Sequence, residues 1–257
     1  MKIQFLGTAG GRFGVSRQER ASGGIYIETC GKKLYLDPGP GALVHARRNN
    51  IPLEELDAIL LSHVHQDHTN DANVLIDILT KGGWEKKGIL IGSRTALEGH
   101  ENIEKAILDY YLNFMEKIVV MEPGDTFDLD SLKITATPTK HGDPKGIGFV
   151  LKGEKTLSYV SDSYYFKGLE EHHKNSDILI LNHIFPREES TAEKKNKDHT
   201  DTYSAEKLIE RTDPKLVITQ HFGLTMMKVG PENEARWLEE QTGMKVVAAK
   251  DFQVFEF

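Results

Sequence analysis

The chain lacks a second cysteine, since Cys30 is the only one among its 257 residues. An internal disulfide is therefore excluded, and this cysteine usage is typical of a reducing compartment, so we expect a cytoplasmic protein. No apolar run approaches the roughly 18 residues that a membrane span needs. Residues 1–7 also lack the long apolar stretch of a secretory signal. We therefore expect neither contact with a membrane nor secretion.

The chain also lacks an excess of positive charge. It has 32 Lys and Arg residues against 39 Asp and Glu residues, which gives a formal net charge of -7. A large nucleic acid would be repelled at long range, so we expect none as a partner, whereas local charge can still bind a small anionic substrate. Repeats and Pro/Ser-rich linkers are missing as well, and we therefore expect a single domain over residues 1–257.

Short apolar runs alternate with glycine-containing turns along the chain. The runs predicted as strands are 2–6, 24–28, 33–36, 58–61, 89–91, 117–121, 132–137, 146–151, 156–160, 177–181, 216–219, 245–247 and 252–255. The segments predicted as helices are 42–49, 73–80, 101–114, 204–211 and 232–242. This mixture indicates an α/β fold in which two sheets pack face to face with helices outside. We interpret the aromatic face of 101–114 as core or as a contact in a homodimer.

The most informative motif is HVHQDH at residues 63–68, directly after the apolar strand 58–61. Its four metal-capable side chains lie within six residues, on a loop that leaves a buried strand, and can converge on one or two ions. Imidazole and carboxylate ligands suit Zn²⁺, and also Mn²⁺ or Fe²⁺. We therefore expect divalent metal ions, zinc as the first choice and manganese as the second.

Ligand-type residues recur at three later strand ends. His141, Asp162 and His221 each follow one of the predicted strands. Each alone is more typical of a hydrogen-bonded surface residue, but together with the HVHQDH motif they indicate a metal centre at strand ends, where active sites concentrate. Two cations about 3.5–4 Å apart generate a hydroxide at neutral pH and clamp the oxygens of a displacement centre.

In combination these motifs resemble the metallo-β-lactamase superfamily, which carries His-x-His-x-Asp-His and then His, Asp and His in this order. The resemblance extends from Leu6 to Gly223. It implies the four-layer αβ/βα sandwich known as the metallo-β-lactamase fold. It also implies that His63, His65 and His141 bind one metal, that Asp67, His68 and His221 bind a second, and that Asp162 bridges the two.

Two carboxylates keep alternative interpretations. Asp67 is read in some such motifs as a general base, but with a second metal present we interpret it as a ligand. Asp37 follows the strand 33–36, where the family has an acidic residue that supports a metal-binding histidine. The alternative is an ordinary turn carboxylate within Asp-Pro-Gly-Pro-Gly.

Within the superfamily, GTAGG at 7–11 and LDPGPG at 36–41 look like the ribonuclease Z and phosphodiesterase branch. His199 stands where that branch carries an extra histidine that acts near the leaving group, although Asp201 replaces the usual Ser or Thr. A histidine can protonate a leaving alkoxide near neutral pH. The alternative for His199 is a solvent-facing histidine at the entry to a helix.

The resemblance implies a dinuclear metal-dependent hydrolase, which we interpret as a phosphodiesterase that cleaves small or cyclic phosphodiesters through a metal-bound hydroxide. One alternative is a hydrolase of the same fold that acts on a thioester, lactone or β-lactam and does not need His199. The other is a metal-binding protein with little turnover. Ribonuclease Z-type enzymes hold tRNA with a long basic arm. His141 and Asp162 are only 162 − 141 = 21 residues apart, so we expect poor processing of precursor tRNA.

Several features stay unassigned. His183 follows the strand 177–181 and is expected near the site without a stated role. The run 187–197 is either a solvated loop or a lid that meets an anionic substrate, because it brings Arg187 and three lysines just before His199. The histidines expected on the surface are His45, His100, His172 and His173.

Overall fold

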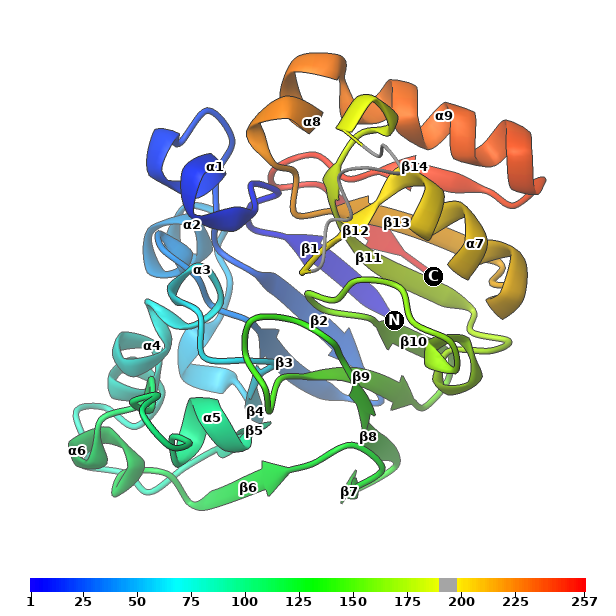
Figure 1. The fold of residues 1–257 in the computed structure, drawn as a ribbon. Helices are drawn as coiled ribbons and strands as arrows, with labels where there is room; N and C mark the ends of the chain where they lie inside the picture. Colours follow the sequence, from blue (N-terminus) through cyan, green and yellow to red (C-terminus); the bar gives the residue numbers. More distant parts are fainter. Residues whose placement is uncertain (190–197) are drawn as a thin grey trace.

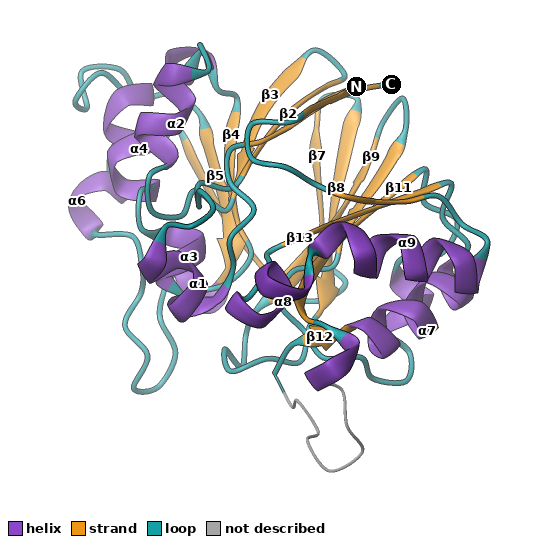
Figure 2. Cartoon of the chain, turned by 90° about the horizontal axis from the view of Figure 1, so that it is seen from above, coloured by secondary structure: helices purple, strands orange, loops and turns teal. Residues whose placement is uncertain are grey.

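The computed structural model describes residues 1–189 and 198–257. Two β-sheets pack face to face, and helices cover the outer face of each, which gives four layers (Figure 1, Figure 2). The α/β fold predicted from the sequence is confirmed. Among the described residues, no helix is both long and apolar enough to cross a lipid bilayer.

Seven strands form the first sheet: β1 (Lys2–Phe5), β2 (Ile25–Thr29), β3 (Lys32–Leu36), β4 (Ala58–Leu61), β5 (Ile89–Ser93), β6 (Lys117–Met121) and β15 (Val254–Glu256). Their spatial order is β15-β1-β2-β3-β4-β5-β6, and β3 to β6 run parallel. All four residues of β4 are buried, because the second sheet covers one face and helices cover the other. This double cover explains why β4 reads as an unbroken apolar run.

Eight strands belong to the second sheet: β7 (Thr126–Leu129), β8 (Leu132–Pro138), β9 (Ile147–Lys152), β10 (Thr156–Tyr159), β11 (Ile178–Phe185), β12 (Thr200–Asp201), β13 (Leu216–Gln220) and β14 (Val246–Ala248). Their order is β14-β13-β11-β10-β9-β8-β7, with β12 paired to β11. β8 and β10 are both antiparallel to β9, and β10, β11 and β13 run parallel. The carboxyl ends of β8, β10, β11 and β13 therefore lie at the same edge.

The helices form the two outer layers (Figure 2). On the side of the first sheet are α1 (Gly11–Arg17), α2 (Ala42–Arg48), α3 (Gln66–Thr69), α4 (Ala72–Leu79), α5 (Arg94–Leu97) and α6 (Asp109–Leu112). On the side of the second sheet are α7 (Thr202–Thr212), α8 (Leu224–Val229) and α9 (Pro231–Thr242). Short 3₁₀ turns occur at η1 (Leu53–Glu55), η2 (Leu169–His172) and η3 (Arg187–Glu189).

Three apolar clusters hold the layers together. The cluster between the sheets includes Phe5 and Phe149. A second joins the first sheet to its helices through Ile59 and Leu75, and a third joins the second sheet to α7 and α9. Each large apolar side chain buried in this way contributes about 1.5–3 kcal/mol to folding. The sandwich is thereby rigid at the strands whose ends carry the polar residues described below.

The predicted helix over 101–114 is wrong, because only α6 forms in this segment. Neighbouring elements bond its backbone from outside. The Ala106 N–H donates to the carbonyl of Ala96, and the Asn73 side chain bonds both the Ala106 carbonyl and the Leu108 N–H. These groups are therefore not available for a helical ladder.

Other differences concern short elements and one histidine. The helices α1 and α8 were not predicted, because α1 starts inside the glycine-rich opening and α8 has only six residues. The expectation of a surface position is wrong for His173, which is 1% exposed. It ends the η2 turn, where its N–H donates to the Glu170 carbonyl, and this turn directs the ring inward while His172 stays exposed.

Candidate metal centre

Histidine and aspartate side chains from both sheets meet at one edge of the sandwich. His63 follows β4, His141 follows β8, Asp162 follows β10 and His221 follows β13. Ligand atoms fall into three overlapping groups, and those of each group lie within 4.8 Å of one another. The groups are His63, His65 and His141; Asp67, His68, Asp162 and His221; and His141, Asp162 and His199. Every residue predicted from the sequence as a ligand is thus part of one assembly, together with His199.

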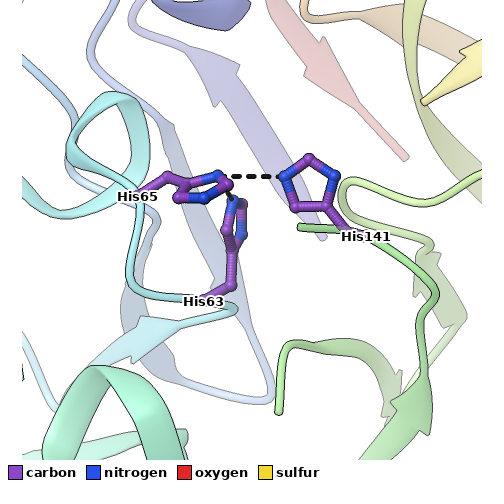
Figure 3. Close-up of side chains that lie close together, drawn as sticks. All are labelled: His63, His65 and His141. Carbon is purple, nitrogen blue, oxygen red and sulfur yellow. Dashed lines mark hydrogen bonds between the residues drawn. The ribbon is translucent and has the colours of Figure 1, made fainter. Parts of the chain in front are cut away.

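The first group consists of three imidazoles that point at one another (Figure 3). Nδ1 of His65 lies 3.2 Å from Nε2 of His63 and 2.9 Å from Nε2 of His141. Nδ1 of His141 donates to the Asp198 carbonyl at 2.6 Å, and Nδ1 of His63 lies 3.0 Å from the Ser62 hydroxyl. With these protons placed on Nδ1, the Nε2 lone pairs of His63 and His141 face the centre. This donor set fits a divalent cation.

The second group combines two imidazoles with two carboxylates. Nε2 of His68 lies 3.1 Å from Nε2 of His221, and the latter lies 3.3 Å from Asp67 Oδ2. Asp162 stands between the two groups. Its Oδ2 lies 3.5 Å from His68 Nε2 and 3.9 Å from His63 Nε2. A carboxylate in this place has the geometry that a bridging ligand requires.

The candidate ligands differ in protonation state. Burial alone would lower the pKa of His68, but Asp162, Asp67 and Asp37 hold it well above its usual value, so His68 has to lose a proton when it binds a metal. Burial, together with His68, holds the pKa of His63 well below its usual value, and burial also lowers the pKa of His65. Burial alone would raise the pKa of Asp162, but His221, His68 and His199 hold it well below its usual value. Imidazoles that stay neutral and carboxylates that stay ionised are the forms that ligate metals.

The backbone turns sharply where three of the strands end. Asp37, Ser161 and His221 follow β3, β10 and β13, and their φ values of 50°, 63° and 62° lie in the left-handed region. Such a conformation costs a non-glycine residue roughly 1–2 kcal/mol. Backbone strain of this kind gathers at functional sites and persists because the surrounding structure enforces it. Here it directs Asp37 and His221 into the assembly.

Asp37 is buried and orients two of the imidazoles. Its Oδ2 accepts hydrogen bonds from His68 Nδ1 at 2.9 Å, from the Ser62 hydroxyl at 2.6 Å and from the Tyr159 hydroxyl at 2.8 Å. Because the Ser62 hydroxyl also contacts His63, one carboxylate acts on both His63 and His68. Of the two interpretations of Asp37, the contacts therefore favour support of a histidine over an ordinary turn carboxylate.

Sequence reasoning missed several polar residues around the assembly. Burial and Asp37 hold the pKa of Tyr159 well above its usual value, so this phenol remains a donor. The Asn182 amide donates to Asp162 Oδ1 at 2.6 Å and to the Tyr159 hydroxyl at 3.1 Å. Tyr159 and Asn182 lie on the neighbouring strands β10 and β11 and meet only through the register of these strands, so the sequence carries no local signal for them.

The glycine turns of the first half lie against the assembly. A Cβ on Gly10 would stand 2.2 Å from the His221 ring, and one on Gly39 would stand 2.0 Å from the Asp67 carbonyl oxygen. The Gly11 N–H donates to Asp67 Oδ2 at 3.0 Å. These glycines therefore allow main chain to approach two candidate ligands closely.

His199 lies in the assembly, with Nδ1 3.5 Å from Asp162 Oδ2 and its ring centroid 4.6 Å from that of His141. Its side chain is 20% exposed, which contradicts a solvent-facing histidine. Burial lowers the pKa of His199 to about 4, against the opposing effect of Asp162. The ring is therefore neutral near pH 7 in the protein alone.

His183 lies on β11 rather than after it, and its Nε2 bonds the Thr202 hydroxyl at 2.9 Å, outside the assembly. Of the run 187–197, only Arg187–Glu189 belongs to the described residues, as η3. The three lysines of the predicted lid lie outside the described residues.

A cleft of about 860 Å³ opens beside the assembly. Its walls come from α1, from the loops after β4 and β8, and from the segment that carries His199. Arg12 is the only lysine or arginine among the described residues that line it. Within the described chain, the Arg12 guanidinium has no hydrogen-bond or ion-pair partner. It is therefore available to an anion.

Comparison with known proteins gives matches over most of the chain. Residues 32–222 match the model of the β-lactamase superfamily domain. An uncharacterized protein of Methanocaldococcus jannaschii is 34% identical over 255 residues, which cover 97% of this chain and 92% of that protein. Ribonuclease Z of Methanopyrus kandleri is 29% identical over 147 residues, which cover 55% of this chain and 47% of that enzyme.

Solved structures show the same fold. The metallo-β-lactamase fold protein YhfI from Bacillus subtilis has a TM-score of 0.79 at 20% identity, covering 100% of this chain and 98% of that one. A diphosphatase from the PhnP family has a TM-score of 0.71 at 19% identity, covering 100% and 97%.

The two ligand groups predict about two divalent ions per chain, as in two-metal sites. Elemental analysis of protein purified without chelator checks the number, and dialysis against a chelator should remove the ions. His63→Ala and His68→Ala should each lower the metal content, whereas His172→Ala, at an exposed position, should leave it unchanged. Full metal content and activity in both ligand variants would show that the ions bind elsewhere.

The contacts of Asp37 predict that Asp37→Asn lowers zinc affinity about 10–100-fold, because two imidazoles lose the acceptor that orients them. Competition with a chromogenic chelator measures this affinity. Asp128→Asn removes an exposed carboxylate from β7 and serves as the matched control. Equal zinc affinity for Asp37→Asn and the wild type would leave Asp37 without a role in orienting the ligands.

Proposed function

The chain belongs to the metallo-β-lactamase superfamily, and from this premise we propose that it is a metal-dependent phosphodiesterase for small or cyclic phosphodiesters. The observation that carries the proposal is the position of His199, beside Asp162 and on the wall of the cleft. Hydrolysis of a thioester, lactone or β-lactam does not need a histidine there. The ribonuclease Z relative cleaves a phosphodiester backbone, as its name states, and supports the same choice of bond.

The candidate ligands form two sets, one for each metal ion. His63, His65 and His141 would hold one ion, Asp67, His68 and His221 would hold the other, and Asp162 would be shared between them. When bound, such ions neutralise charge on the phosphoryl oxygens and lower the pKa of water. The residue set is nitrogen and oxygen only, which suits zinc and also manganese. We take zinc as the first choice.

His199 acts on the leaving group. In hydrolysis, water adds to phosphorus, the bond from phosphorus to the ester oxygen breaks, and that oxygen needs a proton if it leaves as an alkoxide. An anionic diester in the cleft favours the protonated ring of His199, which then donates its proton to the leaving oxygen. Asp162, whose Oδ2 lies 3.5 Å from Nδ1, favours the protonated form of the ring by its charge.

The cleft suits a small anion. A volume of about 860 Å³ accommodates a nucleotide-sized molecule. Arg12 supplies a cation with free hydrogen-bond donors, and a guanidinium pairs with phosphate through two parallel hydrogen bonds. The protein as a whole has a net charge of -7, which opposes the approach of a long polyanion.

We expect His199→Ala to retain its metal and to lose on the order of 10²–10⁴ in kcat for a diester with an alkyl leaving group. The loss should be much smaller for a nitrophenolate leaving group, which departs without a proton. Steady-state rates on a series of leaving groups, measured with elemental analysis of the same samples, check this. Equal losses across the series, or loss of metal, would contradict the role of His199.

We expect efficient hydrolysis of bis-aryl or cyclic phosphodiesters and poor processing of precursor tRNA. Between His141 and Asp162, β9 and β10 fill the chain and leave only short loops, so this segment offers no arm for tRNA. Side-by-side assays at low salt are the test, because a basic patch shows itself best there. Site-specific cleavage of precursor tRNA without activity on small diesters would overturn the proposed substrate class.

Two further outcomes separate the other functions. Turnover of thioesters or lactones at rates above those of diesters, unchanged in His199→Ala, would identify an acyl hydrolase. Full metal content with no turnover on either panel would identify a metal-binding protein. Arg12→Ala should raise KM for anionic diesters in steady-state assays, because Arg12 is the only lysine or arginine among the described residues that line the cleft.

A further inference from the structure

A buried carboxylate on α9 lies outside the metal centre. Glu234 is 1% exposed, and Arg187 and Thr202 both bond it. The Arg187 side chain donates from Nη2 to Oε1 at 2.9 Å and from Nε at 3.1 Å, and the Arg187 N–H donates to Oε2 at 3.0 Å. The Thr202 hydroxyl donates to Oε2 at 2.6 Å. Arg187 and Thr202 keep the pKa of Glu234 below its usual value although burial opposes this, so the carboxylate is ionised.

The two partners of Glu234 stand on either side of His199 in the chain. Arg187 follows β11, and Thr202 is the first residue of α7. Figure 2 shows α7 and α9 side by side over the second sheet, with β12 at its edge. One carboxylate from a third element therefore ties both flanks of the segment that carries His199.

His183 completes the arrangement. Its Nε2 lies 2.9 Å from the Thr202 hydroxyl, and because that hydroxyl donates to Glu234, His183 is the donor in this bond. The backbone of His183 pairs with Thr200, whose hydroxyl donates to the Ser163 carbonyl at 2.7 Å. The neighbours of His199 are thus bonded on several sides, while Nδ1 of its own ring has no hydrogen-bond partner within the described residues.

Aromatic rings cover the outside of the same contact. The Arg187 guanidinium lies 4.7 Å from the centre of the Trp237 ring, and the Tyr203 ring meets that ring edge-on at 5.7 Å. The Trp237 ring covers one side of the Arg187 guanidinium, whose side chain is still 34% exposed, and the two-pronged contact with the buried Glu234 carboxylate gives the pair a defined direction. Removing one member of a buried pair is strongly destabilising, because the other charge stays uncompensated.

We propose that Glu234 is a positioning residue for His199, and that the Arg187–Glu234–Thr202 contact, called the clamp below, holds the His199 ring beside Asp162. The inference rests on the proposed role of His199 in the reaction. Glu234 touches neither the donor groups nor the cleft lining. A displacement of about 1 Å at a reacting group costs on the order of 10²-fold in rate, so a contact remote from the chemistry can control it.

The kinetic test uses zinc-loaded full-length protein and Glu234→Gln, which keeps the shape and removes the charge. We expect kcat to fall about 10²-fold for an alkyl leaving group and far less for nitrophenolate, with zinc content unchanged. In a His199→Ala background, Glu234→Gln should cause almost no further loss, because the group that it positions is gone. Glu240→Gln, at an exposed position of the same helix, is the matched control and should match the wild type.

Thr202 provides a second, milder pair of variants. Thr202→Val removes the hydroxyl that bonds Glu234 and His183 and should reproduce the selective loss, whereas Thr202→Ser keeps the hydroxyl and should restore the rate. If Glu234→Gln does not fold, the comparison of Thr202→Val with Thr202→Ser tests the clamp in its place. An equal loss in the presence and absence of His199, or a loss that ignores the leaving group, would overturn the clamp as a positioning device.

A spectroscopic readout separates failure of the clamp from failure of the proposed function. In nitrogen-15 NMR of histidine-labelled, zinc-loaded protein, the His199 signals are assigned by their loss in His199→Ala. Glu234→Gln should shift or broaden these signals and leave those of the distant His45 unchanged. Unchanged His199 signals would refute the clamp even if diesters are hydrolysed. A wild type that hydrolyses no diester, with His199 signals that respond to Glu234→Gln, would refute only the phosphodiesterase.

Discussion

The crowding of histidine and aspartate side chains at the candidate metal centre is the constraint on which the rest of the structure depends. Eight histidine and aspartate side chains of the described residues have their ligand atoms within a few ångströms of one another. The imidazoles disfavour protonation of one another, whereas the carboxylates attract the imidazolium forms, and burial removes the water that would screen both effects. Only a rigid frame can hold them so. The two sheets supply it, because four of the donors leave directly or shortly after strands whose apolar faces are packed on both sides.

The residues that the sequence predicts as donors come together in the structure because they stand at ends of buried strands, and such strands are visible as apolar runs. The run 58–61 coincides with β4, and HVHQDH follows it at once. The polar residues that hold the donors were not visible, because Tyr159 and Asn182 meet Asp162 and Asp37 only through the register of β10 and β11. Side-chain spacing also misled over 101–114, where backbone bonds to other elements replaced a helix.

Two carboxylates support the site, and they differ in their distance from the candidate metal centre. Asp37 accepts a hydrogen bond from His68 Nδ1, and this bond fixes the direction in which the Nε2 lone pair of His68 points. Glu234 bonds Arg187 and Thr202, which stand on either side of His199 in the chain, and in our proposal it acts on the position of the His199 ring. His183, which the sequence left without a role, belongs with the contacts of Glu234. If the proposed roles hold, metal affinity depends on the contacts of Asp37, and the rate on poor leaving groups depends on those of Glu234.

The left-handed turns at Asp37, Ser161 and His221 bear on how such a protein can diverge. The main chain sets the direction in which each strand end points, so the backbone determines where a donor lies. The side chain determines only which donor atom stands there. Substitution at the ends of the strands can then exchange one donor for another without rebuilding the sheets. A scaffold of this kind separates the evolution of its chemistry from the evolution of its stability.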